Sequence, residues 1–203
     1  MKRFSIVSTV APVAFALVAG SAFALNAGTA APDFNVADAS GKNVKLSDYK
    51  GKYVVLEWTN PDCPFVRAQY GADAMQAVQK EAKGKEVVWL TINSTNKNNS
   101  EFKTGAQMSE WMKSKGAAQS AILIDPTSAT ARAYDAKTTP HMFVVDPKGT
   151  IVYAGAIDDK RSARESDRKT ANNYVRAALG ESMAGKPVTT ANTTPYGCSL
   201  KYD

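Results

Sequence analysis

Two cysteines carry most of the chemistry that this sequence could perform. Cys63 lies in the stretch EWTNPDCPFVRAQY (57–70), where an apolar run ends and Pro64 favours the start of a helix. The thiolate is the reactive form of cysteine, and the unpaired N–H groups at a helix N-terminus stabilise it. Arg67 would add positive potential one turn into the helix, whereas Asp62 would oppose it. The stretch predicts a nucleophilic Cys63 that ionises more readily than a free cysteine; an inert, buried core cysteine is the alternative.

Cys198 lies in the last segment of the chain, GKPVTTANTTPYGCSLKYD, which is rich in threonine, proline and glycine. After an attack, Cys63 would be left as a sulfenic acid or a mixed disulfide, and Cys198 is the one internal thiol that could resolve it. The entropy of closing so long a loop rises only slowly with its length. Three arrangements are open: Cys198 resolves Cys63, bridges it permanently, or stays free or pairs with another chain.

The first 24 residues predict a secretory signal peptide. Lys2 and Arg3 precede an uncharged apolar run, and Ala22 and Ala24 form an A-x-A cleavage pattern. An uncleaved membrane anchor is the alternative, although the run is short for a bilayer span. We therefore expect a periplasmic or secreted protein, in a compartment where disulfides persist.

The rest of the chain suits one domain, residues 25–185, followed by a tail, residues 186–203, that carries Cys198. The formal net charge is +6, but basic residues are interspersed with acidic ones, as in 158–170. A nucleic-acid surface needs a denser basic stripe, so we expect no nucleic-acid partner. The sequence predicts neither a metal nor a cofactor.

The predicted elements place Cys63 at the carboxyl end of a core strand, and ligands of open α/β sheets bind at that end. A helix joins two parallel strands, and an antiparallel hairpin follows, which predicts an α/β fold with a central mixed sheet and helices on both faces. Asp125 or Thr127 would cap the short third helix. The predicted strands span 53–58, 85–94, 121–125, 142–146 and 151–157, and the predicted helices 64–83, 102–116, 127–136 and 166–182.

This arrangement resembles the thioredoxin superfamily, in particular its exported thiol–disulfide proteins and the redoxins related to peroxiredoxins. The stretch from APDF (31–34) to YVVLEW (53–58) looks like the N-terminal hairpin and first core strand of that group. Cys63 falls where the attacking cysteine lies, and TTP (138–140) looks like the cis-proline loop. The resemblance implies a thioredoxin-like fold with an N-terminal β-hairpin extension and a flexible C-terminal tail.

The resemblance also assigns supporting roles near Cys63. Glu57 matches a buried carboxylate that assists proton transfer, although a strand-end carboxylate with a surface partner is equally open. Pro140 would be cis, which X–Pro bonds tolerate, and the backbone of Thr139 could pair with an extended substrate; a plain trans turn is the alternative. The second cysteine of the C-x-x-C motif is replaced by Val66, so a local dithiol is absent.

Two further residues bear on the kind of redox chemistry. Peroxiredoxins place Thr or Ser three residues before the reactive cysteine, where this chain has Asn60, so peroxidase activity is in doubt. His141, the single histidine, could act as a general base if it points toward Cys63. A partly exposed histidine at a strand end is the other interpretation.

Three functions compete at this stage. The first is an exported thiol-dependent oxidoreductase, either a thiol–disulfide oxidoreductase or a peroxiredoxin-like antioxidant enzyme, with Cys63 and Cys198 as the catalytic pair. Its partners would be a protein disulfide or peroxide as substrate, and a thiol protein or low-molecular-weight thiol as reductant. The second is a non-catalytic binding module that presents the Pro140 loop. The third is a copper carrier that uses Cys63, Cys198, His141 and Met142, soft or borderline ligands without a compact metal motif.

Overall fold

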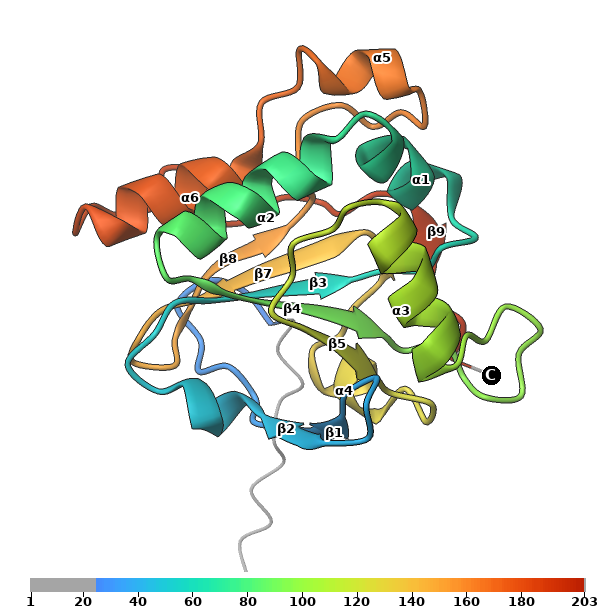
Figure 1. Ribbon diagram of the computed structural model, residues 1–203. Coiled ribbons are helices and arrows are strands. Elements are labelled where there is room, and N and C mark those ends of the chain that lie inside the picture. Colours follow the sequence, from blue (N-terminus) through green and yellow to red (C-terminus); the bar gives the residue numbers. More distant parts are fainter. Residues whose placement is uncertain (1–24, 203) are drawn as a thin grey trace, which may run out of the picture.

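The computed structural model describes residues 25–202, so the predicted signal peptide, residues 1–24, lies outside the described residues. A five-stranded sheet forms the centre of the molecule (Figure 1). In spatial order its strands are β5 (Ala121–Ile124), β4 (Val88–Asn93), β3 (Val54–Trp58), β7 (His141–Val145) and β8 (Ile151–Gly155). β5, β4 and β3 are parallel, whereas β7 is antiparallel to both β3 and β8. The predicted mixed sheet is therefore confirmed.

Successive residues of the central strands point to opposite faces and build two cores, which is why the sheet is covered on both sides. Val55 belongs to one cluster and Leu56 to the other. The first face is covered by α1 (Pro64–Gly71), α2 (Ala74–Gly84), α3 (Gly105–Ser114) and α6 (Tyr174–Met183). The second is covered by the hairpin β1–β2 (Asn35–Ala37 and Asn43–Lys45), the 3-10 helix η1 (Leu46–Tyr49) and α4 (Ala129–Ala133) (Figure 1).

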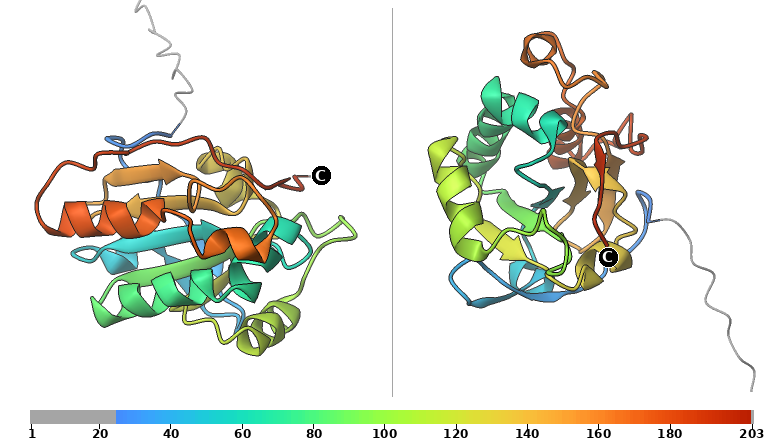
Figure 2. Two further views of the ribbon diagram at one scale, coloured as in Figure 1. Left: turned by 90° about the horizontal axis from the view of Figure 1, so that it is seen from above. Right: turned by 90° about the vertical axis from the view of Figure 1, so that its right-hand side faces the viewer.

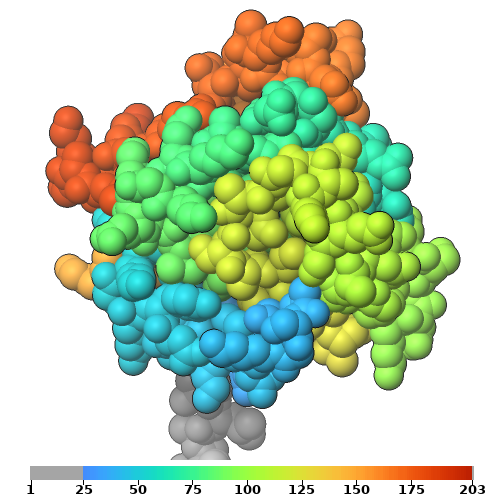
Figure 3. Space-filling view, viewed as in Figure 1, coloured from blue at the N-terminus to red at the C-terminus, as the bar shows by residue number. Residues whose placement is uncertain are grey.

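The predicted N-terminal hairpin is confirmed, and it protects an edge of the sheet. Ala39, in the turn between β1 and β2, donates its N–H to the carbonyl of Ile122 in the edge strand β5 at 2.8 Å. In the space-filling view the hairpin, in blue, lies directly below the helical side of the molecule (Figure 3). Within residues 25–202, no helix is both long and apolar enough to cross a membrane.

Two predicted helices are each divided in the structure. The segment predicted for 64–83 forms α1 and α2, because Asp73 adopts a left-handed conformation with φ of 56° that ends the first helix. The segment predicted for 166–182 forms the short α5 (Glu165–Arg168) and then α6. α6 begins only after Asn173, whose side chain accepts the N–H of Arg176. Periodicity identified the apolar faces but missed the breaks between them.

The C-terminal tail lies along the domain, although its composition predicts flexibility. In Figure 2 the tail, in red, follows the outer edge of the sheet beside β8 toward the Cys63 end. Ala154 of β8 accepts the N–H of Thr193 and donates its own N–H to Ala191. Gly155 permits this approach, because a Cβ there would lie 2.1 Å from Thr193 Oγ1. The tail ends in β9 (Cys198–Ser199), which pairs antiparallel with β6 (Thr138–Thr139).

Replacing the capping carboxylate of α4 should destabilise the fold. Ser128 holds the N-cap position of α4, but its side chain does not cap the helix; Asp125, three residues earlier, accepts the N–H groups of Ala129, Thr130 and Ala131 and the hydroxyl of Ser94. Asp125→Ala leaves these donors without their acceptor, and we expect the free energy of unfolding to fall by about 1–3 kcal/mol. Thr127→Ala, at the exposed alternative cap, should change it by less than about 0.5 kcal/mol. Urea titration of both variants measures the difference, and equal losses would contradict the assignment of Asp125 as the cap.

Candidate active site

Cys63 lies between the end of β3 and the start of α1, facing the proline turn. It occupies the N-cap of α1 with Pro64 as the first helical residue, and its side chain makes no capping hydrogen bond to the N–H groups of the helix. Its Sγ donates a hydrogen bond to the carbonyl of Thr139 at 3.0 Å, and the Thr139–Pro140 peptide bond is cis. The side chain is buried, with 2% of its surface exposed. The sulfur therefore faces the Pro140 turn but is shielded from solvent.

Cys198 reaches the same point from the other end of the chain. In the β6–β9 pair it stands opposite Thr139, the residue whose carbonyl accepts the Cys63 thiol. Both cysteines are free thiols. Burial, followed by a hydrogen bond and charge interaction with Cys63, raises the pKa of Cys198 to about 12. The structure thus brings the two cysteines together in their reduced form.

Gly197 allows the tail to approach this closely, and sequence reasoning missed it. Its φ of 139° is a conformation that side chains rarely adopt. A Cβ built at this position would lie 2.0 Å from the carbonyl oxygen of Thr139. The glycine directly before Cys198 was the available signal, because glycine is typical of a close backbone approach.

Glu57 is fully buried, so the surface-partner interpretation of this residue is wrong. Its carboxylate accepts hydrogen bonds at 2.7–3.2 Å from side chains of α1, α2 and β4. Burial raises the pKa of Glu57, whereas these hydrogen bonds act in the opposite direction. The four donors are Tyr70, Gln79, Trp89 and Thr91. Glu57 lies on the same face of the sheet as Cys63, and its role in proton transfer stays a prediction.

The charges around the Cys63 loop are largely paired with one another. Arg67 donates through Nε to the carbonyl of Pro61 at 2.7 Å, and its Nη2 lies 3.5 Å from Asp62. Asp62 also contacts Lys103 Nζ at 2.6 Å, so its negative charge is compensated. Asn60 shapes the same turn by accepting the N–H of Asp62. Arg67 therefore braces the turn before Cys63, and its predicted effect on the thiolate is untested.

Two residues considered for the active site, Val66 and His141, are instead buried in the packed interior on either side of the sheet. Val66, where the second cysteine of a C-x-x-C motif would be, is fully buried in the cluster that contains Cys63. His141 lies on the opposite face of the sheet, where its ring is 4.6 Å from that of Phe143. His141 is buried rather than partly exposed, and its Nδ1 accepts the N–H of Lys137. Because it points away from Cys63, the interpretation of His141 as a general base for this sulfur is wrong.

The same geometry divides the proposed copper ligands. Met142 shares a cluster with Cys63, whereas His141, its neighbour in the strand, packs on the other side of the sheet. Within the part of the chain that the structure describes, no group of three or more His, Cys, Asp or Glu side chains could hold a metal ion. The arrangement therefore offers no support for the copper-carrier hypothesis.

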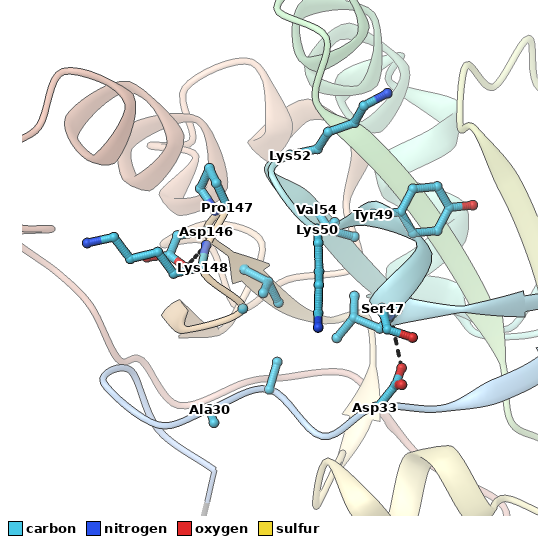
Figure 4. A pocket seen from close by; sticks show the side chains of 14 residues that line it. Ala30, Asp33, Ser47, Tyr49, Lys50, Lys52, Val54, Asp146, Pro147 and Lys148 are labelled. Carbon is cyan, nitrogen blue, oxygen red and sulfur yellow. Dashed lines mark hydrogen bonds between the residues drawn. The ribbon is translucent and has the colours of Figure 1, made fainter.

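A separate pocket of about 320 Å³ lies at the opposite end of the strands from Cys63 (Figure 4). Val54 and Val145, which face each other across β3 and β7, form part of its wall. Lys50 projects between the sides of the pocket that carry Asp33 and Asp146, whereas Lys52 points away. Neither cysteine lines this pocket. The residues capable of redox chemistry are therefore gathered at the other end of the sheet.

Comparison with known proteins gives consistent matches. The AhpC/TSA family model matches residues 27–154, which include Cys63 but not Cys198. Thiol-disulfide oxidoreductase ResA of Bacillus subtilis is 27% identical over 128 residues, 63% of this chain and 66% of ResA, just under two thirds of its length. Thioredoxin-like protein YneN of the same organism is 30% identical over 142 residues, 69% of this chain and 78% of YneN.

A solved structure extends the likeness over most of the chain. The crystal structure of an uncharacterized conserved protein from Geobacillus kaustophilus superposes with a TM-score of 0.76 at 27% identity, covering 88% of this chain and 93% of that one. With the observed strand order, these matches confirm the thioredoxin-like fold.

The buried His141 should make stability depend on pH. Burial lowers its pKa from 6.5 to about 4. Between these values the unfolded chain binds a proton that the folded protein excludes, so stability is lost as the pH falls from 6.5 to 4, by at most about 3 kcal/mol. His141→Gln removes this contribution and keeps an acceptor for the Lys137 N–H. Denaturant titrations from pH 7 to 4 should show wild type losing up to about 3 kcal/mol more stability than His141→Gln, and parallel curves would contradict the assignment.

Adding a methyl group at Gly197 should uncover Cys63. Collision of a Cβ with the carbonyl of Thr139 would displace the tail at a cost of about 1–3 kcal/mol. We expect Gly197→Ala to raise the alkylation rate of Cys63 at least about fivefold. Gly185→Ala is the matched control, because Gly185 also has a positive φ but open space around its Cβ position. An unchanged rate in Gly197→Ala would show that the tail is not the cover.

Proposed function

Because the chain belongs to the AhpC/TSA family, we propose that it is an exported thiol–disulfide oxidoreductase in which Cys63 is the nucleophile and Cys198 the resolving thiol. The observation that carries this proposal is the convergence of both thiols on Thr139, beside the cis Pro140. Two redox-capable side chains far apart in the sequence therefore have one residue, Thr139, as their common neighbour. A thiol redox role gives a reason for two free thiols to lie side by side. A purely structural role does not, because the two thiols form no bond that would hold the tail in place.

The reaction consists of two thiol–disulfide exchange steps. In the first, the Cys63 thiolate attacks one sulfur of a substrate disulfide R–S–S–R′, forming Cys63–S–S–R and releasing R′–S⁻. In the second, Cys198 loses its proton to water and attacks the Cys63 sulfur, which forms the Cys63–Cys198 disulfide and releases R–S⁻. The substrate gains two electrons and the protein loses two. A thiol protein or low-molecular-weight thiol then reduces the protein disulfide.

The state of Cys198 favours this order of events. Burial and the neighbouring Cys63 sulfur raise the pKa of Cys198 to about 12, so Cys198 stays protonated while Cys63 is free. Once Cys63 is bound in a mixed disulfide, its hydrogen bond and charge interaction with Cys198, which raise the pKa of Cys198, are lost, whereas the effect of burial remains. Cys198 then acts on a sulfur that is already beside it, which gives the second step the advantage of an intramolecular reaction.

Disulfides are favoured over peroxides as substrates by the surroundings of Cys63. Asn60 occupies the position where peroxiredoxins have Thr or Ser, and its side chain is engaged by Asp62, Thr95 and Glu101. In addition, a polypeptide strand that carries a sulfur, β9, already fits beside Thr139. Both features suit a partner that is itself a polypeptide with a cysteine.

The extracytoplasmic location rests on the N-terminal pattern. Lys2 and Arg3, the apolar run and the A-x-A pattern that ends at Ala24 are typical of a secretory signal. An oxidising compartment would also supply protein disulfides as substrates. The domain that follows, residues 25–185, and the tail from 186 would then act together outside the cytosol.

A non-catalytic binding module is the second candidate, because Val66 replaces the local second cysteine and Cys63 is only 2% exposed. In such a protein the Pro140 loop would bind a partner without turnover. Cys63→Ser would then leave partner binding and cellular function intact, whereas it abolishes function in the oxidoreductase.

Mass spectrometry of both cysteines tests the proposed reaction. After treatment with a disulfide oxidant, we expect the wild-type protein to contain a Cys63–Cys198 bond that dithiothreitol reverses. Cys198→Ser should instead retain the oxidant fragment on Cys63 as a mixed disulfide. Hydrogen peroxide provides the comparison, and a bond that forms faster with peroxide would assign peroxides as the substrates. Two unmodified thiols after both treatments would contradict a redox role.

A further inference from the structure

The tail is fixed near the active site by a buried polar cluster formed by Asp158, Arg168 and Tyr196. The hydroxyl of Tyr196 donates to Asp158 Oδ1 at 2.5 Å and accepts from Arg168 Nη1 at 2.8 Å. Arg168 Nη1 also lies 2.7 Å from Asp158 Oδ2, and these two side chains are only 1% and 3% exposed. A hydrogen bond between an ionised pair of this kind and a hydroxyl is stronger than a neutral one.

The body of the protein holds the charged pair from several directions. Arg168 Nη2 donates to the carbonyls of Lys160 and Ser162, and Gln69 Nε2 of α1 donates to Asp158 Oδ2 at 2.6 Å. The cluster therefore connects the tail to α1, the helix that follows Cys63. None of these contacts depends on β9, so the pair can receive the Tyr196 hydroxyl as a preformed site.

Tyr196 is separated from Cys198 by Gly197 alone, so fixing its ring restricts where the Cys198 sulfur can lie. The ring packs edge-on against Phe65 of α1, with 5.8 Å between centroids. Phe65 follows Cys63 by two residues in the first turn of that helix. Phe65 thus contacts the ring of Tyr196, and the charged pair binds its hydroxyl.

We propose that Tyr196 is a positioning residue, whose hydroxyl, held by Asp158 and Arg168, keeps Cys198 beside Cys63 for the resolving step. The inference rests on the proposed function, because it concerns the second thiol–disulfide exchange of that reaction. In this step Cys198 displaces a thiolate from the Cys63 mixed disulfide, and Tyr196 takes part in no bond that forms or breaks. A tail without this anchor samples many positions, and the local concentration of Cys198 at Cys63 falls.

Tyr196→Phe tests the anchor, because it removes one hydroxyl and leaves the Asp158–Arg168 pair and the aromatic contact in place. The assay uses the full chain and an aromatic disulfide reagent whose released thiolate is coloured. Wild-type protein should release one thiolate when Cys63 attacks the reagent and a second when Cys198 closes the disulfide. Cys63→Ser and Cys198→Ser assign the two phases.

In Tyr196→Phe we expect the second phase to slow by about tenfold, the scale of losing hydrogen bonds to a charged group. The first phase should be as fast as in wild type or faster. The same tenfold change in the closing equilibrium would raise the reduction potential of the cysteine pair by about 30 mV. Tyr53→Phe is the control, because it removes a hydroxyl contact with Ser182 at the end of β3 opposite Cys63, away from Tyr196 and Cys198, and both phases should stay unchanged.

Two outcomes would overturn the inference, and they are distinguishable. If Tyr196→Phe lowers the free energy of unfolding but leaves the second phase and the potential unchanged, Tyr196 serves the fold alone and the anchor is wrong. If wild-type protein itself shows no second phase, Cys198 does not resolve Cys63, and the proposed function fails along with its refinement.

Discussion

The carbonyl of Thr139 is the point on which the active-site arrangement depends. It accepts the Cys63 thiol, it lies against Gly197, and it belongs to the residue that pairs with Cys198. Each partner comes from a different part of the chain, so the site exists only when helix, proline turn and tail are all in place. The central sheet sets this meeting point, because a short loop joins the end of β3 to Cys63 and β7 begins immediately after Pro140.

The fold was largely predictable from the sequence, whereas the contacts of the tail were not. Apolar runs in strands such as β3 and β4 are unambiguous because both faces of the sheet are buried. The breaks at Asp73 and before Asn173 were missed because a left-handed residue and a side-chain cap leave the apolar periodicity intact. Composition predicted a flexible tail. The backbone hydrogen bonds that hold the tail to β8 and β6 were missed, because they are long-range contacts that local sequence does not encode.

The candidate site was predictable to the extent that its residues follow local rules. Cys63 as a helix N-cap and Pro140 in a turn opposite it depend on spacing within a few residues. The orientation of His141 depends on the parity of a strand whose first residue the sequence does not fix. The cluster around Asp158 and Arg168 lies in a segment that reads as a solvated, charged stretch, because burial of an ion pair is a property of tertiary packing alone.

The hydrogen bonds of the tail to Ala154 also have a consequence for the solution behaviour of the protein. β8 is the outermost strand of the central sheet; residues 28 and 29 bond to its edge at Ile151, and residues 191–193 occupy the edge at Ala154. Open strand edges are templates for pairing with other chains. A molecule whose tail has been removed by proteolysis or has detached would expose the β8 edge at Ala154 to other molecules. The attached tail therefore also opposes edge-to-edge association between copies of the protein.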